Sequence, residues 1–255
     1  MYHYLLSIIF IFSIIFVSFS GCSTKQPIQK ENITIKKLLP PRVCFKPNKL
    51  RLKEALAAKE IHIGAPIYLR IFKHEKILEL WAKKEKTYIL VKSYPICTFS
   101  GKLGPKQKSG DKQSPEGVYA ITKKSLNPNS HYHLAINIQY PNRYDRNFHR
   151  TGNLIMIHGK CSSSGCFAMG DEQIEEIYKM ASASLKTKPF FYVAIYPFKM
   201  EDEKLLKYKD NYWYPFWLNL KTGYDMFEQT HVPPFTGVKG DKYVFQKRGR
   251  NLTQN

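Results

Sequence analysis

The chain has 255 residues, of which 43% are hydrophobic, so it has enough apolar surface for one large domain or two small ones. Its formal net charge of +20 favours a polyanionic partner over a basic or neutral one. A solvated basic surface is the ordinary alternative to such a partner.

The first 22 residues differ in composition from the rest of the chain. The stretch "LLSIIFIFSIIFVSFSGC" is apolar and uncharged and stops at Cys22, which predicts an export signal rather than a membrane span. Ser20 and Gly21 before Cys22 resemble the lipobox of bacterial lipoproteins, which implies a signal peptide over residues 1–22 and lipidation of Cys22. Because no Lys or Arg precedes the apolar run, an uncleaved N-terminal anchor is the alternative.

Either alternative places the rest of the chain outside the inner membrane. We therefore expect a periplasmic protein that is held by a lipid anchor, in the outer membrane. This location argues against nucleic acid as the polyanionic partner. Residues 23–60 follow as a predicted tether and short helix, because prolines interrupt residues 27–47 and a helical apolar pattern covers residues 49–60.

From residue 66 the apolar residues alternate with a period of two, which predicts strands. The expected strands cover residues 66–73, 76–83, 87–94, 117–122, 132–140, 153–159 and 190–198. One long helix is expected over residues 172–185, with Asp171 as its cap. The prediction is a mainly β domain over residues 61–200 and a C-terminal extension over residues 201–255 that packs on it.

The segment "IHGKCSSSGCFAMGD" leaves three interpretations of its two cysteines open. A zinc site is disfavoured because His158, Cys161 and Cys166 supply at most three ligands. A disulfide between Cys161 and Cys166 is sterically possible but would close only a very short loop. The third interpretation is a Cys166 nucleophile with His158 as its base, in which Gly165 lets the backbone approach a substrate and direct N–H groups at an oxyanion.

The third interpretation matches a known family. His158-Gly159 followed by Ser164-Gly165-Cys166 is similar to the catalytic signature of the L,D-transpeptidase (YkuD-type) family, and "GDKQSPEGVYAI" resembles the strand entry of that family. "IMIHGKCSSSGCFAM", "NIQYPNRYDR" and "LKTGYDMFEQTHVPP" are most similar to its periplasmic murein L,D-transpeptidase-like branch. One member of that branch is an amidase that detaches lipoprotein from diaminopimelate.

The resemblance implies a β-sandwich with mixed sheets, no metal and no cofactor. It implies that Cys166 attacks the amide at the L-centre of diaminopimelate in a peptidoglycan stem peptide, while His158 moves the proton and the Gly159 carbonyl orients the imidazole. A thioester then transfers to an amine or to water. The partners implied are stem peptides and a wall-linked lipoprotein, and the carboxylates of the wall fit the basic charge.

Two positions depart from the family pattern. The usual Ser-His-Gly-Cys is Ser163-Ser164-Gly165-Cys166 here, and the Arg or Asn two residues after the cysteine is Ala168. These changes leave the nucleophile and the base in place, but they put cross-link synthesis in doubt. There are two alternatives to a cross-linking enzyme. The chain is a hydrolytic amidase that releases wall-bound lipoprotein, or it is an inactive lipoprotein that binds peptidoglycan.

Several polar residues are candidates to bind the substrate. Lys106, Lys108, Arg143 and Arg146 are candidates for its carboxylates, and further contacts are expected from Ser164, Tyr140, Asn142, Tyr144 and Asp145. Cys161 is expected to be a bystander near the site or half of a disulfide with Cys44 or Cys97.

Overall fold

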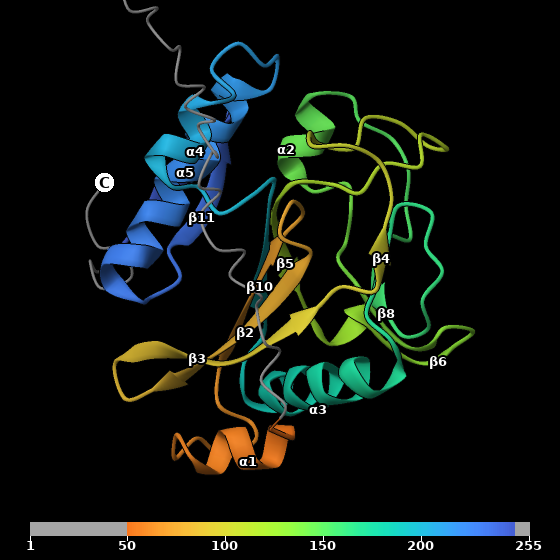
Figure 1. Cartoon of the computed structure of the whole chain (residues 1–255), viewed down its shortest axis with the longest axis vertical. Helices are drawn as coiled ribbons and strands as arrows, with labels where there is room; N and C mark the ends of the chain where they lie inside the picture. The colour runs from red at the N-terminus through yellow and green to blue at the C-terminus, as the bar shows by residue number, and fades with distance from the viewer. Residues whose placement is uncertain (1–49, 248–255) are drawn as a thin grey trace, which may run out of the picture. The chain divides into compact units, whose positions relative to one another are not determined.

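Two five-stranded sheets and a separate hairpin make up most of the fold (Figure 1). The computed structural model describes residues 50–247, so the predicted signal peptide, most of the tether, Cys22 and Cys44 lie outside the described residues. Sheet A has the strand order β3-β2-β1-β10-β5, sheet B has the order β4-β9-β8-β7-β6, and β11 pairs with β12.

The elements have the following bounds. The strands are β1 (Ile67–Phe72), β2 (Ile77–Lys84), β3 (Thr87–Pro95), β4 (Thr98–Phe99), β5 (Gly117–Ile121), β6 (Leu126–Ser130), β7 (His133–Asn137), β8 (Met156–His158), β9 (Phe167–Ala168), β10 (Phe191–Tyr196), β11 (Phe235–Lys239) and β12 (Lys242–Gln246). The helices are α1 (Leu52–Ala57), η1 (Lys123–Ser125), α2 (Arg143–Asn147), α3 (Asp171–Thr187), α4 (Asp202–Leu206) and α5 (Tyr214–Thr230).

Both sheets are mixed. In sheet A, β1 pairs with β10 in parallel and the other pairs are antiparallel. In sheet B, β8 pairs with β9 in parallel and its remaining pairs are antiparallel. This arrangement confirms the predicted mainly β fold with mixed sheets.

Sheet A is buried on both faces. Successive side chains of a strand point to opposite sides. Leu69 of β1 therefore joins the core between the sheets, together with Ile157 of β8 and Phe167 of β9. Tyr68 and Phe72 point the other way, into a second apolar core. The central strands β1 and β10 are consequently buried at every position.

The helices α3 and α1 complete the core between the sheets. Buried residues of α3, including Ile174 and Ile177, lie in that core, and α3 contacts β7 and β8 (Figure 1). The N–H of Leu52 in α1 donates to Glu176 of α3 at 2.8 Å. Asp171 is not the cap of α3, because Gly170 holds the N-cap position and the Asp171 carboxylate accepts from the Lys160 N–H at 2.7 Å.

A second long helix, α5, was not expected from the sequence. It has 17 residues, the same length as α3, and its buried Trp217, Leu220 and Phe227 pack in the second core. The prediction of one long helix is therefore wrong in its count. No helix within residues 50–247 is both long enough and apolar enough to cross a membrane.

The guanidinium of Arg70 attaches α5 to sheet A. Arg70, on β1, forms a buried ion pair with Glu79 of β2 at 2.7 Å and a second ion pair with Glu228 of α5. Its charge also lies 4.9 Å from the ring centroid of Trp81 and 4.7 Å from that of Phe227. Such cation–π contacts strengthen when the cation is desolvated.

A second buried charge connects α5 with the loop that follows β4. The fully buried Lys73 Nζ donates to Glu116 Oε1 at 3.0 Å, and to the carbonyls of Gly104 and Ser114. The other carboxylate oxygen of Glu116 accepts from Trp217 Nε1 at 2.7 Å. Burial lowers the pKa of Lys73, and Glu116 opposes this shift. The hub of Lys73, Glu116 and Trp217 thus fixes both ends of the loop from residue 104 to residue 116.

Candidate active site

The parallel pair β8–β9 brings His158 and Cys166 onto one face of sheet B. Ile157 lies opposite Phe167, and His158 lies opposite Ala168. Extending this register by one position places Cys166, just before β9, beside Met156. Paired residues in neighbouring strands share a face, and residues two apart on one strand share it too. His158 and Cys166 are therefore diagonal neighbours on the same face of sheet B.

The imidazole of His158 is buried and oriented. Its exposed fraction is 1%, and Nδ1 lies 2.6 Å from the carbonyl oxygen of Gly159. This hydrogen bond assigns the proton of the neutral ring to Nδ1 and leaves Nε2 as the proton acceptor. Tyr132 covers the ring, with a distance of 4.5 Å between ring centroids. Burial lowers the pKa of His158, and the Gly159 carbonyl partly opposes this shift.

Gly159 has no room for a side chain. A Cβ at this position would lie 2.6 Å from Asp171 Oδ1 and 2.7 Å from the carbonyl oxygen of Tyr132. The neighbouring Lys160 N–H is the group that bonds this Asp171 oxygen. The glycine therefore allows the start of α3 to pack directly against the backbone that orients His158.

Cys166 is a free, half-buried thiol. The N–H of Met156 donates to its Sγ at 3.4 Å, and Sγ contacts the carbonyl oxygen of Leu154 at 3.6 Å. Burial raises the pKa of the thiol, while the Met156 N–H and the positive charge of Lys106 oppose this shift. Together with the lowered pKa of His158, this describes a neutral thiol beside a neutral imidazole rather than an ion pair.

Cys161 forms a disulfide with Cys97, and the Cα atoms are 5.4 Å apart. The alternative bond between Cys161 and Cys166 is therefore excluded, and of the two suggested partners for Cys161 it is Cys97 that binds it. The N–H of Cys97 also donates to the Ala168 carbonyl at 2.9 Å. The disulfide consequently fastens the start of the loop between His158 and Cys166 to the strand beside β9.

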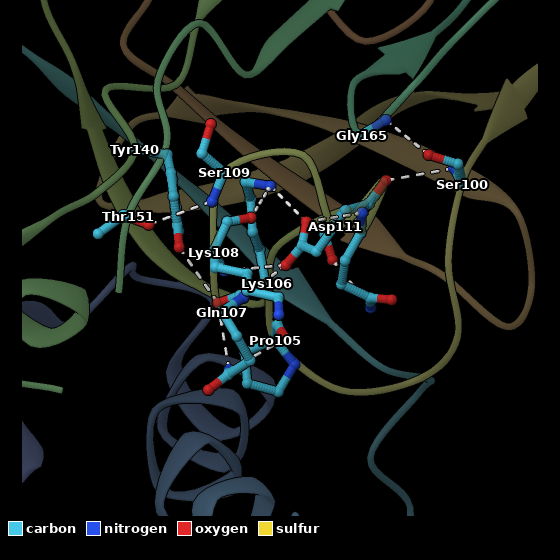
Figure 2. Close-up of polar contacts among 12 residues, drawn as sticks. Ser100, Pro105, Lys106, Gln107, Lys108, Ser109, Asp111, Tyr140, Thr151 and Gly165 are labelled. Atoms are coloured by element: carbon cyan, nitrogen blue, oxygen red, sulfur yellow. Dashed lines mark hydrogen bonds and ion pairs between the residues drawn. The ribbon is translucent and has the colours of Figure 1, made fainter. Parts of the chain in front are cut away.

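Serine hydroxyls hold the end of the same loop. Ser163 Oγ donates to the Cys166 carbonyl at 2.7 Å, and Ser114 Oγ contacts that carbonyl at 3.4 Å. The N–H of Gly165 donates to Ser100 Oγ at 2.5 Å (Figure 2). This N–H is therefore not available to an oxyanion here, contrary to the role expected for it. Gly165 instead supplies a positive φ of 103° that aims the chain into β9.

Lys106 is not a free cation at the surface. It is buried, with an exposed fraction of 4%, and Nζ donates to Asp111 Oδ1 at 2.5 Å and to the Lys108 carbonyl at 2.9 Å. Figure 2 shows Lys106 and Asp111 pointing toward each other inside the loop, with Tyr140 reaching in from another segment. Burial of Asp111 is outweighed by its bond from Lys106 and by backbone N–H bonds, which hold its pKa below the usual value.

Tyr144 and Asp145, expected to bind substrate, serve the fold instead. Asp145 is fully buried and pairs with Arg150 at 2.9 Å. Tyr144 stacks on Tyr243 of β12, with 4.4 Å between ring centroids. Tyr243 is distant from Tyr144 in the sequence, and Arg150, although close to Asp145 in the sequence, is buried by distant elements. The local sequence therefore could not distinguish Tyr144 and Asp145 from surface residues.

Of the remaining candidates for substrate binding, some have partners within the fold and others are exposed. Tyr140 is buried and donates to the Lys106 carbonyl at 3.2 Å, and Asn142 caps α2 and donates to Tyr243 Oη at 2.8 Å. Arg143 and Ser164 are exposed, so they are able to meet a ligand directly. The structure also brings Tyr132, Ser100 and Ser114 to the site, which sequence reasoning did not single out. Only Ser114 lay in a recognised motif, "SPEG".

Residues 50–247 contain no group of three or more His, Cys, Asp or Glu side chains that could hold a metal ion. Fold and site together define a mixed β-sandwich in which a free thiol and an oriented imidazole lie on neighbouring strands.

The sequence comparisons place this chain in a family. Residues 66–190 match the model of the L,D-transpeptidase catalytic domain (YkuD). The chain is 45% identical over 190 residues to "Putative L,D-transpeptidase YafK" of Escherichia coli K12, and equally to its counterpart in Escherichia coli O157:H7. The match covers 74% of this chain and 77% of each relative. The chain belongs to the L,D-transpeptidase family.

Solved structures give a weaker similarity. The helical cell shape determining protein Pgp2 from Campylobacter jejuni matches at 15% identity with a TM-score of 0.43, over 74% of this chain and 81% of that one. A mutant of the same protein matches at 18% identity with a TM-score of 0.44, over 69% and 63% of the two chains.

Proposed function

We propose that this chain is an acyl-transfer enzyme that acts on peptidoglycan stem peptides through a thioester on Cys166. The observation that carries the proposal is the parallel register of β8 and β9, which sets a free thiol and an oriented imidazole on one face. Membership of the L,D-transpeptidase family supports peptidoglycan as the substrate class.

In the acylation step, Sγ of Cys166 attacks the carbonyl carbon at the L-centre of diaminopimelate. The thiol proton passes to Nε2 of His158, because Nδ1 is engaged with the Gly159 carbonyl. This transfer requires the thiol to turn from the Leu154 carbonyl, its present contact, toward the imidazole. As the C–N bond breaks, His158 returns the proton to the leaving amine and the C–S bond remains.

In the second step an acceptor attacks the thioester. An amine acceptor yields a new cross-link or an attached lipoprotein, whereas water yields a trimmed stem or a released lipoprotein. In each case His158 accepts a proton from the acceptor, the C–S bond breaks, and the thiol recovers its proton. The catalytic pair is the same for all of these products, so access to the thioester decides between them. The family has His at the position of Ser164 and Arg or Asn at the position of Ala168. These two differences favour water, or a specialised amine, as the acceptor that attacks the thioester.

Digestion of purified murein sacculi with the wild-type protein, followed by chromatography of the muropeptides, tests this proposal. We expect Cys166-dependent changes in the products, absent from Cys166→Ala and reduced at least about 100-fold in His158→Ala. His133→Ala is the matched control for the second variant, because His133 is an exposed histidine on β7 that pairs with Glu175.

The product pattern separates the alternatives. Released lipoprotein identifies an amidase, new dimers identify a transpeptidase, and shortened stems identify a carboxypeptidase. If no product changes in a Cys166-dependent way while the protein still binds sacculi, the chain is a peptidoglycan-binding lipoprotein and the enzymatic proposal is wrong.

The proposal includes a location at the periplasmic side of a bacterial envelope, with a lipid on Cys22. The apolar N-terminal run and the residues before Cys22 support it. Radioactive palmitate should label the wild-type protein in cells and should fail to label Cys22→Ser. Equal labelling of the two proteins would contradict the anchor.

A further inference from the structure

A polar pocket of about 430 Å³ is lined in part by Leu154, a residue that also contacts Cys166. Residues from three segments line it, including Asn137, Gln139, Arg143, Arg146, Asn153 and Leu154. Leu154 connects the pocket with the site, because its carbonyl oxygen is the group 3.6 Å from Cys166 Sγ. Leu154 is therefore common to the pocket and to the surroundings of the sulfur.

Two guanidinium groups give the pocket its charge. Arg143 and Arg146 are both exposed side chains of α2, and within residues 50–247 neither forms a salt bridge with a carboxylate. Nη1 of Arg146 donates to the Pro141 carbonyl at 2.5 Å, which orients the group and leaves its other donors for a ligand. Guanidinium N–H groups match the geometry of a carboxylate.

The neighbouring polar groups point to the same ligand chemistry. The side-chain oxygen of Asn137 accepts from the Gln139 N–H at 2.9 Å, so the amide nitrogen of Asn137 is its remaining group, and that nitrogen is a donor. Lys106, the cation whose charge acts on the Cys166 thiol, is already paired with Asp111. Arg143 and Arg146, which line the pocket without an ion pair among the described residues, have capacity for an external anion.

We propose that this pocket binds a carboxylate of the acyl-donor peptide and thereby sets the scissile carbonyl against Cys166. This inference rests on the proposed function, since it names how the same site recognises its substrate.

Binding of synthetic peptides by calorimetry tests the pocket without requiring turnover. The protein is the Cys166→Ala variant, and the probes are a stem peptide with diaminopimelate at the reacting position and its counterparts with each carboxylate converted to a carboxamide. We expect one carboxamide to weaken binding about 10-fold or more. Adding Arg143→Gln and Arg146→Gln should weaken binding of the carboxylate peptide equally and leave that carboxamide peptide unaffected.

Lys123→Gln with Lys124→Gln is the matched control, because it removes the same charge from two exposed lysines that do not line the pocket. Equal weakening by both pairs of substitutions would reduce the effect to net charge and overturn the inference. Equal affinity for all peptides, or no measurable binding, would overturn it as well. Circular dichroism and thermal melting verify that each variant folds.

The two proposals fail separately. Discrimination between the peptides by the pocket, with no thioester adduct detected by mass spectrometry on the wild-type protein, would refute the enzymatic function and retain the binding site. A thioester adduct on Cys166, together with no effect of the arginine substitutions on peptide binding, would retain the enzymatic function and refute the binding site.

Discussion

The chemistry of Cys166 depends on how little water reaches it and its neighbour. Burial raises the pKa of the thiol and lowers the pKa of His158, so both groups are neutral near pH 7. A neutral imidazole is ready to accept a proton, and the thiol keeps its proton until a substrate arrives. The site therefore behaves as a general-base pair, in contrast to a preformed thiolate–imidazolium pair.

This assignment predicts the pH dependence of Cys166 alkylation by iodoacetamide. Only the thiolate reacts, and the raised pKa of Cys166 lies above the usual value of about 8.5. The rate should therefore rise about 10-fold per pH unit from pH 6 to pH 8.5, without a plateau. A mass-spectrometric time course on the intact protein measures it, with Cys166→Ala as the unreactive control. A plateau that begins below pH 7 would indicate a thiolate–imidazolium pair and contradict the assignment.

At this scale the sequence revealed His158 and Cys166 as candidates because their spacing and the glycines around them are local features. The roles of Tyr144, Asp145 and Lys106 were not predictable in the same way. Each is decided by a neighbour that the fold supplies, such as Tyr243 for Tyr144. A polar or aromatic residue has the same local signature whether it meets a ligand or a buried partner.

Among the elements, the short strand β4 and the disulfide beside it constrain the catalytic loop. The bond between Cys97 and Cys161 closes a loop across a sequence separation of 64 residues. In the chain-entropy model a crosslink of this length stabilises the folded protein by about 4 kcal/mol. Strand β8, which carries His158, lies between β7 and β9. The disulfide also fastens the backbone on the β9 side of that strand.

We expect Cys97→Ser with Cys161→Ser to lower the free energy of unfolding by about 2–4 kcal/mol in urea. Cys166→Ser, which keeps the disulfide, is the matched control and should change the midpoint little. Identical midpoints for the double variant and the wild-type protein under oxidising conditions would contradict this role of the bond.

The hub of Lys73, Glu116 and Trp217 makes a second prediction about the elements. Glu116→Ala would leave Lys73 as an uncompensated buried charge, which costs about 3–5 kcal/mol. Urea denaturation followed by circular dichroism measures the loss. Glu203→Ala, which removes an exposed carboxylate of α4, should have little effect. A comparable loss in both variants would argue that the hub contributes nothing specific.

Seven strands, β1–β3, β5, β7, β8 and β10, were predictable from local sequence patterns, and α3 was predictable from its apolar stripe. The strands β4, β6, β9, β11 and β12 were not expected from the sequence. The helix α5 was not expected either, since its aromatic residues and Gly223 have weaker helix propensity and its buried face meets strands far away in sequence. Packing against sheet A, rather than propensity, is what defines α5.

Across the whole molecule, sheet A separates two cores, and α4, α5 and the hairpin β11–β12 cover the face that points away from sheet B. Tyr68, Phe72 and Tyr196 depend on this cover for burial. An uncovered aromatic face of this kind favours aggregation.

A chain that ends at residue 200 is therefore expected to be insoluble or molten, with weak near-ultraviolet circular dichroism and strong binding of an apolar dye. A chain that ends at residue 247 is the control and should melt cooperatively. Cooperative melting of the shorter chain would mean that residues 61–200 fold as an independent domain.

The parallel contact between β8 and β9 has a mechanical consequence. Proton acceptor and sulfur belong to one layer, and the two layers meet across an apolar core that carries no reacting atom. Slippage or breathing between the layers would thus leave unchanged the distance over which the proton must travel.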